Sequence, residues 1–264
     1  NPKGPNLKNK SNKRRFTLMK RQTTPAIVLR RWPWSESSLA LRILTPGHGT
    51  ITLRAKGVYK ATSGSMGVLD TWALVEVDMG GPPNSDFQQL YRCRLLDRMS
   101  GLSESPEKLA AAGLFGELAE LAAPPGQDSG PVFRFLLRTL QAIHQGFDLD
   151  GLLCSGLLEA LSHLGLDPQL KVEPETTDAL WFHHEAGGVL PPNTPRPEGH
   201  SRLMSHALRT LLLECPQEPA AAEEADPALL EEAFTILGEF LHFHLERPPR
   251  AWNALRHRQA ALNR

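Results

Sequence analysis

Between residues 24 and 97, hydrophobic and polar positions alternate with the two-residue period of β-strands. In the run SLALRILT, Leu39, Leu41 and Ile43 lie on one face, while Arg42 lies on the other. The pattern predicts five strands, over residues 26–34, 38–45, 50–55, 70–79 and 87–96. Five strands of this length, with short hairpins and one longer loop, are typical of a small closed barrel.

The third predicted strand continues the alternation and defines the outer face. Ile51 and Leu53 face one way, whereas Thr50, Thr52 and Arg54 face the other. The preceding turn has the sequence PGHG, and its two glycines can adopt the positive φ values of a short hairpin loop. Polar and cationic side chains are therefore expected together on the outside of the barrel.

After about residue 97 the hydrophobic spacing changes to that of α-helices. It predicts helices over residues 106–122, 131–145, 149–164, 201–214 and 228–246. The expected apolar stripe of the first helix consists of Leu109, Leu114, Leu118 and Leu121. The candidate caps are Ser103 or Ser105 before the first helix, Gly165 after the third, and Asp226, followed by Pro227, before the last. Residues 167–200 carry six prolines and no long apolar run, which indicates an irregular insertion.

Charge is segregated along the chain although the formal net charge is zero. Residues 1–60 hold 14 Lys and Arg and one acid, Glu36, so 15 of the 29 basic and 28 of the 29 acidic residues remain for the rest. The last 18 residues add a second basic patch with five arginines and no acid. A basic end on an acidic chain favours a polyanionic partner, with nucleic acid first and a merely solvated basic tail as the alternative.

The cations of the predicted barrel combine with aromatic residues nearby. Arg42 and Arg54 share the outer face, and Lys56 and Lys60 follow in the next loop. Such a groove can follow a phosphate backbone while aromatic rings stack on bases. The aromatic candidates are Trp32, Trp34 and Tyr59, each of which could equally be a core or rim residue.

Several other classes of protein find no support. The chain has no run of about 18 apolar residues, and its basic N-terminus is not followed by the apolar segment of a secretory signal. The three cysteines are odd in number and far apart, which indicates no disulfide framework and fits a reducing cytoplasm. No P-loop, nucleophile elbow or H-E-x-x-H motif is present, so an enzyme is the least favoured class. His183, His184, His200 and His206 do not form a metal-ligand pattern, because adjacent histidines do not easily face one ion.

Several segments, in order along residues 19–257, resemble those of the RecO family of bacterial recombination mediators. They are AIVLR at 26–30, SES at 35–37, LT at 44–45, Gly49, AKG at 55–57, EAGGVL at 185–190 and FHLERP at 243–248. The resemblance implies an α+β protein with an N-terminal OB-fold barrel and a helical domain that carries an inserted zinc-ribbon-like element. Residues 1–18 match nothing in the family and are expected to be a disordered basic extension or a cloning remnant.

The resemblance also implies a function. RecO proteins bind single- and double-stranded DNA and anneal complementary strands. With RecR, they help load RecA onto DNA coated by the single-stranded DNA-binding protein, whose acidic C-terminal peptide is an expected partner of the helical domain.

From the same resemblance we expect a bacterial, cytoplasmic protein that is associated with the nucleoid and not with a membrane. The expected domains are 19–98 for nucleic-acid binding and 99–264 for the helical part, with the irregular insertion at about 167–200. The residues expected to contact DNA are Arg30, Arg42, Arg54, Lys56 and Lys60, with Arg250, Arg256 and Arg258 as a second set.

The chain departs from the family in the zinc element. Many members carry two cysteine pairs there, which would fall near 171–176 and 191–194, but neither segment contains a cysteine. Zn²⁺ needs about four N, S or O ligands. We therefore expect no cofactor and a metal-free finger that packs around Trp181, Phe182 and Leu190.

Two other functions remain open on the sequence. An OB-type RNA-binding or translation-associated protein would have the same barrel, and selectivity for the 2′-hydroxyl would distinguish it. A non-catalytic interaction scaffold would instead use a groove between the helices to take a partner peptide.

Overall fold

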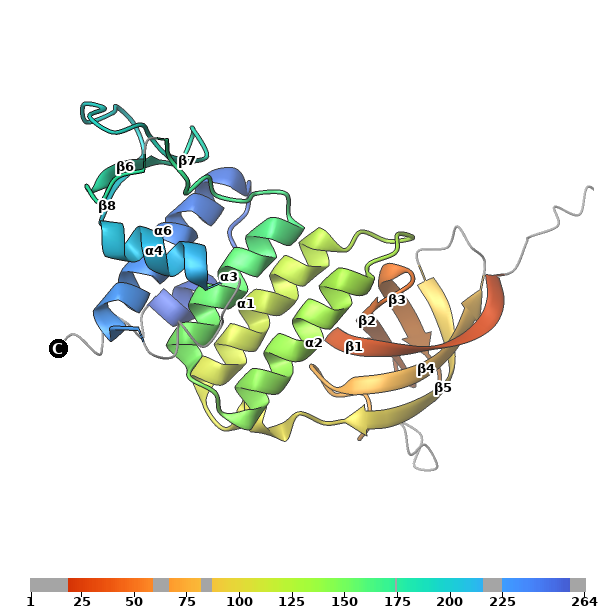
Figure 1. Cartoon of the computed structure of the whole chain (residues 1–264). Helices are drawn as coiled ribbons and strands as arrows, with labels where there is room; N and C mark the ends of the chain where they lie inside the picture. The colour runs from red at the N-terminus through yellow and green to blue at the C-terminus, as the bar shows by residue number, and fades with distance from the viewer. Residues whose placement is uncertain (1–18, 59–66, 82–86, 174, 216–224, 257–264) are drawn as a thin grey trace, which may run out of the picture.

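The computed structural model describes residues 19–58, 67–81, 87–173, 175–215 and 225–256 (Figure 1). A β-barrel lies at one end, a layer of long helices lies beside it, and a small sheet with the C-terminal helices occupies the opposite end. The expected α+β architecture, with an OB-like barrel followed by a helical part, is confirmed.

The barrel is closed by five strands: β1 Met19–Ser35, β2 Ser38–Thr45, β3 Gly49–Ala55, β4 Leu74–Gly81 and β5 Phe87–Asp97. Their order is β1-β2-β3-β5-β4, and the β3–β5 pair is parallel while the other pairs are antiparallel. The predicted alternation is confirmed, because Leu39, Leu41 and Leu53 are buried in the barrel core while Arg42 and Arg54 alternate with them. The sequence pattern therefore placed both arginines correctly on the outer side.

Strand β1 is longer than the predicted 26–34 because it serves two neighbours. Its first half pairs with β4 and its second half with β2, and Ile27 pairs with both. A register shift between Val28 and Arg30 lets the strand bend between them. Ala26 and Val28 belong to the barrel core, whereas Ile27 and Leu29 belong to the core of the helical part. Residues 19–25 lack the apolar pattern of a strand, and backbone pairing with β4 extends β1 over them.

The helical part begins with a short 3-10 helix, η1 Ser100–Ser103, and continues with α1 Pro106–Ala122, α2 Gly130–Gln145, α3 Leu149–His163, α4 His206–Glu214 and α6 Pro227–His244. The predicted caps are confirmed at Ser105, whose Oγ accepts from Lys108 N, and at Asp226, which accepts from Ala228 N. Gly165 follows α3 with φ of 71°. Capping residues therefore set the ends of these helices largely as the sequence indicates.

The predicted apolar stripe of α1 is only half right. Leu114 and Leu118 are buried, but Leu109 and Leu121 are 48% and 53% exposed. The buried face is centred on Phe115 instead, because the small residues around it let α2 and α3 approach closely. At 3.6 residues per turn, the outer two leucines then lie on other sides of the helix.

The barrel and the helices are joined by hydrogen bonds between the β2–β3 turn and the α1–α2 loop. The amides of Thr50, Gly126 and Ser129 donate to the carbonyls of Ala123, His48 and Pro46 at 3.0, 2.9 and 2.7 Å. Gly49 has φ of 61°, and a Cβ on it would lie 2.2 Å from the Pro124 carbonyl oxygen. The turn therefore needs glycine at position 49 both for its backbone conformation and for this close approach.

A small sheet at the opposite end contains β6 Leu180–His183, β7 Gly188–Val189 and β8 Ser201–Met204, in the order β7-β6-β8. The prediction of a helix over 201–214 is wrong for residues 201–204, which form β8. Leu180 pairs with Met204 across the sheet, so tertiary pairing overrides the local helical pattern. Helix α4 then starts at His206, capped by Ser205 Oγ, which accepts from Leu208 N.

Aromatic packing attaches the insertion to the helices. Phe182 is fully buried and its ring centroid lies 5.4 Å from that of Phe240 in α6. Trp181 accepts a backbone hydrogen bond from Leu190 and lies beneath the Arg196 guanidinium at 5.8 Å. Within the described ranges, no group of three or more His, Cys, Asp or Glu side chains is arranged to hold a metal ion.

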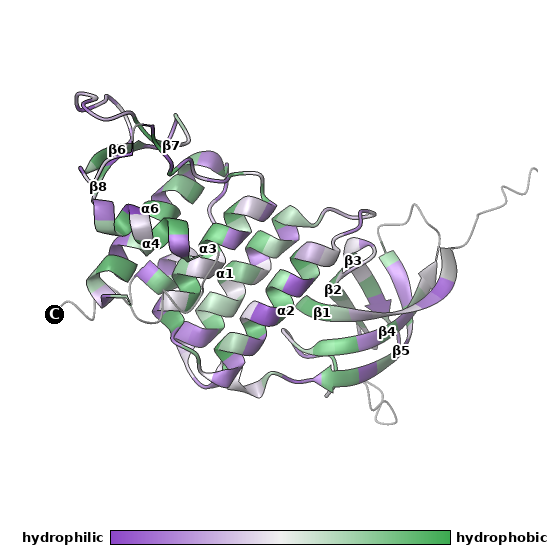
Figure 2. Cartoon of the chain, in the orientation of Figure 1, coloured by the Kyte–Doolittle hydropathy of each residue, from purple (hydrophilic) through white to green (hydrophobic). Residues whose placement is uncertain are grey.

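Figure 2 shows hydrophobic and hydrophilic residues mixed along each of the long helices, as expected for amphipathic elements that cover a core. In the part of the chain that the structure describes, no helix has the length and apolar content that a membrane span requires.

Candidate nucleic-acid interface

The outer face of the barrel is built from two neighbouring rows of residues that run across β1, β2, β3 and β5. One row contains Arg30, Arg42, Thr52 and Phe87, and the next contains Trp32, Ala40, Arg54 and Gln89. Successive rows two residues apart share a face of a sheet. The strand register thus brings Arg30 to the same face as Arg42 and Arg54, whose outward positions the alternation predicted.

Aromatic side chains cover one end of this face. Trp34 at the end of β1 is 47% exposed, and its ring centroid lies 4.6 Å from that of Phe87 at the start of β5. Trp32 is 36% exposed and lies in the same row as Arg54. The loops after β1 and before β5 are the ones that OB folds use, together with the β2–β3 face, to bind oligonucleotides. Phe87 was not among the aromatic candidates of the sequence, and Tyr59 lies outside the described residues.

Arg54 and Lys56 are cations without an ion-pair partner among the described residues. The Arg54 side chain is half-buried, and its Nε is shielded from solvent with no hydrogen-bond acceptor in the described part of the chain. Lys56 is exposed just after β3. A shielded guanidinium nitrogen without an acceptor is energetically unfavourable. Lys60 of the same predicted set lies outside the described residues.

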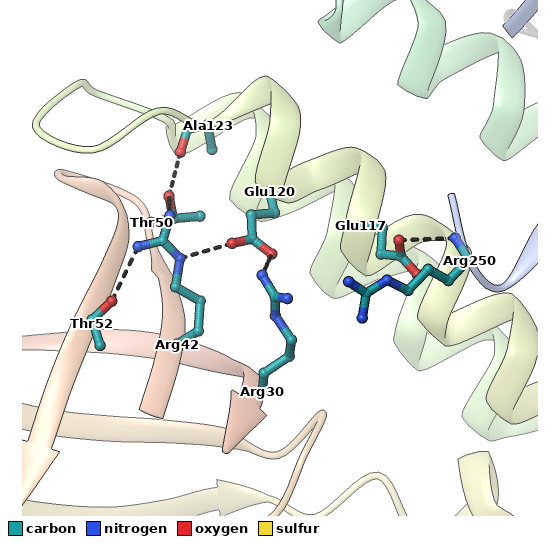
Figure 3. Close-up of polar contacts among 8 residues, drawn as sticks. All are labelled: Arg30, Arg42, Thr50, Thr52, Glu117, Glu120, Ala123 and Arg250. Carbon is teal, nitrogen blue, oxygen red and sulfur yellow. Dashed lines mark hydrogen bonds and ion pairs between the residues drawn. The ribbon is translucent and has the colours of Figure 1, made fainter. Parts of the chain in front are cut away.

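Arg30 and Arg42 are held differently, because both contact Glu120 of α1 (Figure 3). Arg30 Nη2 lies 2.6 Å from Glu120 Oε2, and Arg42 Nε lies 2.8 Å from Glu120 Oε1. The remaining Arg42 nitrogens donate to the hydroxyls of Thr52 and Thr50, at 3.2 and 2.9 Å. Nothing in the sequence singles out Glu120, which occupies an ordinary position in an amphipathic helix.

Several other arginines of the barrel also form ion pairs. Arg21 of β1 forms an ion pair with Asp78 of β4 and lies over the Tyr91 ring at 4.8 Å. The hydrogen bond from Arg21 lowers the pKa of Asp78 below its ordinary value. Arg31 similarly lies 2.8 Å from Asp70. Arg54 and Lys56, and also the exposed Arg92 of β5, are cations of the barrel that form no ion pair within the described residues.

The second predicted set of arginines is divided by the fold. The Arg250 amide donates to Glu117 Oε2 at 3.0 Å (Figure 3). Glu117 lies about one turn before Glu120 in α1, so Arg250 contacts the same helix that Arg30 and Arg42 contact. Arg256 is exposed at the rim of a separate cavity near the small sheet. Arg258 lies outside the described residues.

The cavity beside Arg256 has a volume of about 690 Å³. It is lined by His184, His200 and Phe243, and burial lowers the pKa of His184. His184 is 4% exposed, and neither of its ring nitrogens has a hydrogen-bond partner within the described part of the chain. Its lining residues come largely from β8 and α6, which lie at the end of the molecule opposite the barrel (Figure 1).

Comparisons with known proteins match both halves of the chain. The family model described as recombination protein O N terminal matches residues 19–99, and the one described as recombination protein O C terminal matches residues 103–253. A DNA repair protein RecO from Chlorobaculum parvum is 27% identical over 244 residues, covering 86% of this chain and 93% of that protein. Those from Roseiflexus sp. and Cutibacterium acnes are 28% and 27% identical, covering 86% and 84% of this chain and 82% and 93% of theirs. The chain therefore belongs to the RecO family of DNA repair proteins, which are non-catalytic recombination mediators.

Proposed function

We propose that this protein binds single- and double-stranded DNA through its barrel and anneals complementary strands. With RecR, it would help load RecA onto DNA coated by the single-stranded DNA-binding protein. The observation that carries the DNA-binding assignment is the outer face of the barrel, where Arg54 lies in the same row as the exposed ring of Trp32. Lys56 follows Arg54 just after β3, Trp34 follows Trp32 at the end of β1, and neither cation has an ion-pair partner within the described residues. We assign DNA binding to residues 19–98 and the protein contacts to residues 99–264.

The mechanism of binding follows from this combination of charges and rings. Cations that neutralise phosphates release the counterions condensed on DNA, so affinity falls steeply as salt rises. Stacking of a base on an exposed indole contributes about 1–3 kcal/mol and tolerates any base, because every base has a π-face. A strand held by its phosphates and a few stacked bases keeps its other bases free to pair, which is the state that annealing requires.

The salt dependence of binding tests this face directly. The triple variant Arg54→Ala, Lys56→Ala, Lys60→Ala should lower the slope of log affinity against log salt by about 0.7 per lost contact on single strands. The matched control is Lys171→Ala, which removes an exposed cation distant from the barrel and should leave the slope unchanged. An unchanged slope in the triple variant would rule out this surface.

Mediator activity has its own assay. Complementary oligonucleotides coated with the single-stranded DNA-binding protein should anneal faster when the protein is added. Absence of acceleration would count against the mediator function.

An OB-type RNA-binding function remains the second candidate, supported by the same barrel face. Competition between matched DNA and RNA oligonucleotides separates the two, since an RNA-binding protein would favour the strand with 2′-hydroxyls.

We assign the acidic C-terminal peptide of the single-stranded DNA-binding protein to a cavity of about 1110 Å³ between α2, α3 and the end of α4. Its lining includes the apolar side chains of Leu152 and Leu158, an Arg138–Glu159 ion pair, Asp167 and the exposed cation of Lys171. Apolar walls with a cation at the rim complement an acidic peptide that also carries apolar residues. Lys171→Glu should weaken the fluorescence anisotropy signal of the labelled peptide, whereas Lys56→Glu should not. Equal binding by both variants would exclude this cavity.

All the relatives named above are bacterial proteins, and the proposed partners are DNA and the proteins that coat it. We therefore place this protein in the bacterial cytoplasm, associated with the nucleoid.

A further inference from the structure

Glu120 occupies the position of a bound anion on the outer face of the barrel. Its two carboxylate oxygens are each engaged by a different guanidinium, Oε2 by Arg30 and Oε1 by Arg42, at 2.6 and 2.8 Å (Figure 3). The carboxylate side chain is only 18% exposed, so water screens these contacts less than ordinary surface pairs. Both arginines lie in the row next to Arg54, on the face proposed to contact DNA.

A DNA phosphate offers the same chemistry as the Glu120 carboxylate. Guanidinium groups bind both anions with charge-assisted hydrogen bonds of similar geometry. Arg30 is 58% exposed on its side chain, so a phosphate can reach it, and Arg42 lies behind it at 22%. Phosphate and Glu120 therefore compete for the same donors.

Loss of the Glu120 contacts does not undo the junction between the barrel and the helices. The backbone hydrogen bonds between Thr50 and Ala123 and between Ser129 and Pro46 remain. Thr50 Oγ1 also donates to the Ala123 carbonyl at 2.9 Å. The arginine side chains can therefore change partner while the two parts of the protein stay joined.

We propose that Glu120 is a positioning residue that holds Arg30 and Arg42 away from DNA in the free protein, and that a phosphate displaces it upon binding. The inference rests on the proposed DNA-binding function and adds an internal competitor to it. Breaking the two ion pairs then subtracts from the affinity, so the protein binds DNA less tightly than its arginines would otherwise allow.

The test is a double-mutant cycle, measured as single-stranded DNA affinity at fixed, near-physiological salt. Glu120→Gln keeps the shape but removes the charge, and it should bind about fivefold more tightly, the equivalent of about 1 kcal/mol. Glu159→Gln is the matched control, because it removes the same charge from an ion pair on α3 and should leave affinity unchanged. In a background of Arg30→Ala and Arg42→Ala, Glu120→Gln should produce no gain.

A purely structural role for Glu120 would not produce a gain that depends on the two arginines. Thermal melting checks that each variant is folded. If the glutamine variant melts well below the wild type, Glu120→Asp replaces it. Its shorter carboxylate cannot span both guanidinium groups, and the expected gain is about twofold, a fraction of one ion pair.

Each remaining outcome overturns the inference. A gain that persists without the two arginines would mean that Glu120 only repels DNA at a distance. If Glu120→Gln produced no gain while binding still depended on Arg54 and Lys56, Glu120 would not compete with DNA. The proposed DNA-binding function would then still stand. Failure of the wild type to bind any DNA would remove the proposed function and this inference with it.

Discussion

Replacing Gly49 with alanine should destabilise the whole protein through the junction between the barrel and the helices. Gly49 has φ of 61°, a conformation that costs an ordinary residue about 1–2 kcal/mol. The new Cβ would also lie 2.2 Å from the Pro124 carbonyl oxygen and 2.9 Å from that of Ala123. Since real Cβ atoms do not approach so closely, the α1–α2 loop must move away.

The size of the effect follows from the contacts that this movement breaks. The Thr50 amide and hydroxyl both donate to the Ala123 carbonyl, at 3.0 and 2.9 Å. Each lost hydrogen bond costs about 0.5–1.5 kcal/mol. With the backbone strain added, the free energy of unfolding should fall by about 2–5 kcal/mol, which lowers Tm by roughly 4–20 °C for a chain of this size.

Gly47 in the same turn provides the matched control. It has no positive φ, and an added Cβ would meet nothing within 4 Å. Gly47→Ala should therefore be neutral or slightly stabilising, because alanine reduces the entropy of the unfolded chain. Urea unfolding followed by circular dichroism measures both variants. Equal midpoints for the two alanine variants would refute the argument that Gly49 is required by this junction.

Three further predictions concern the interface, a thiol and a helix cap. Trp34→Ala should weaken single-stranded DNA binding by about 1–3 kcal/mol, measured by fluorescence anisotropy, while Phe147→Ala, at an exposed aromatic residue just after α2, should not. Equal losses in the two variants would mean that Trp34 does not stack on a base. Burial raises the pKa of Cys93 to about 11, so at pH 8 this thiol should react with a disulfide reagent about a hundredfold more slowly than a thiol of pKa 9. The reaction rate should rise about tenfold per pH unit until near pH 11, and a rate that levels off by pH 9 would contradict the prediction. Ser105→Ala removes the cap on the Lys108 amide and should cost about 0.5–2 kcal/mol in urea unfolding, and no change would mean that this cap contributes nothing.

The outer face of the barrel could be predicted because a strand has a fixed period. Once Leu39, Leu41 and Leu53 were assigned to the interior, Arg42 and Arg54 had to lie outside. The length of β1 could not be predicted in this way. Its first residues carry no apolar pattern, and pairing with β4, together with the Arg21–Asp78 ion pair, extends the strand.

The partners of the site residues were beyond sequence reasoning. The register of β1 and β2 places Arg30 beside Arg42, but only the docking of α1 brings Glu120 to both. The exposed positions of Leu109 and Leu121 have the same origin, since neighbouring helices decide which face of α1 is covered. Contacts between distant segments therefore account for most of what the local patterns missed.

The double use of β1 has a practical consequence for dissecting this protein into fragments. Ile27 and Leu29 of β1, together with Leu44 of β2, are fully or almost fully buried against the helical core. A fragment cut after β5 would expose all three side chains to water on the β1–β2 side of the barrel. Such a fragment is expected to self-associate, and its DNA binding would reflect an aggregate and not the native surface. DNA binding by the barrel is better studied in the full chain, with point substitutions that remove the binding contacts of the helical part.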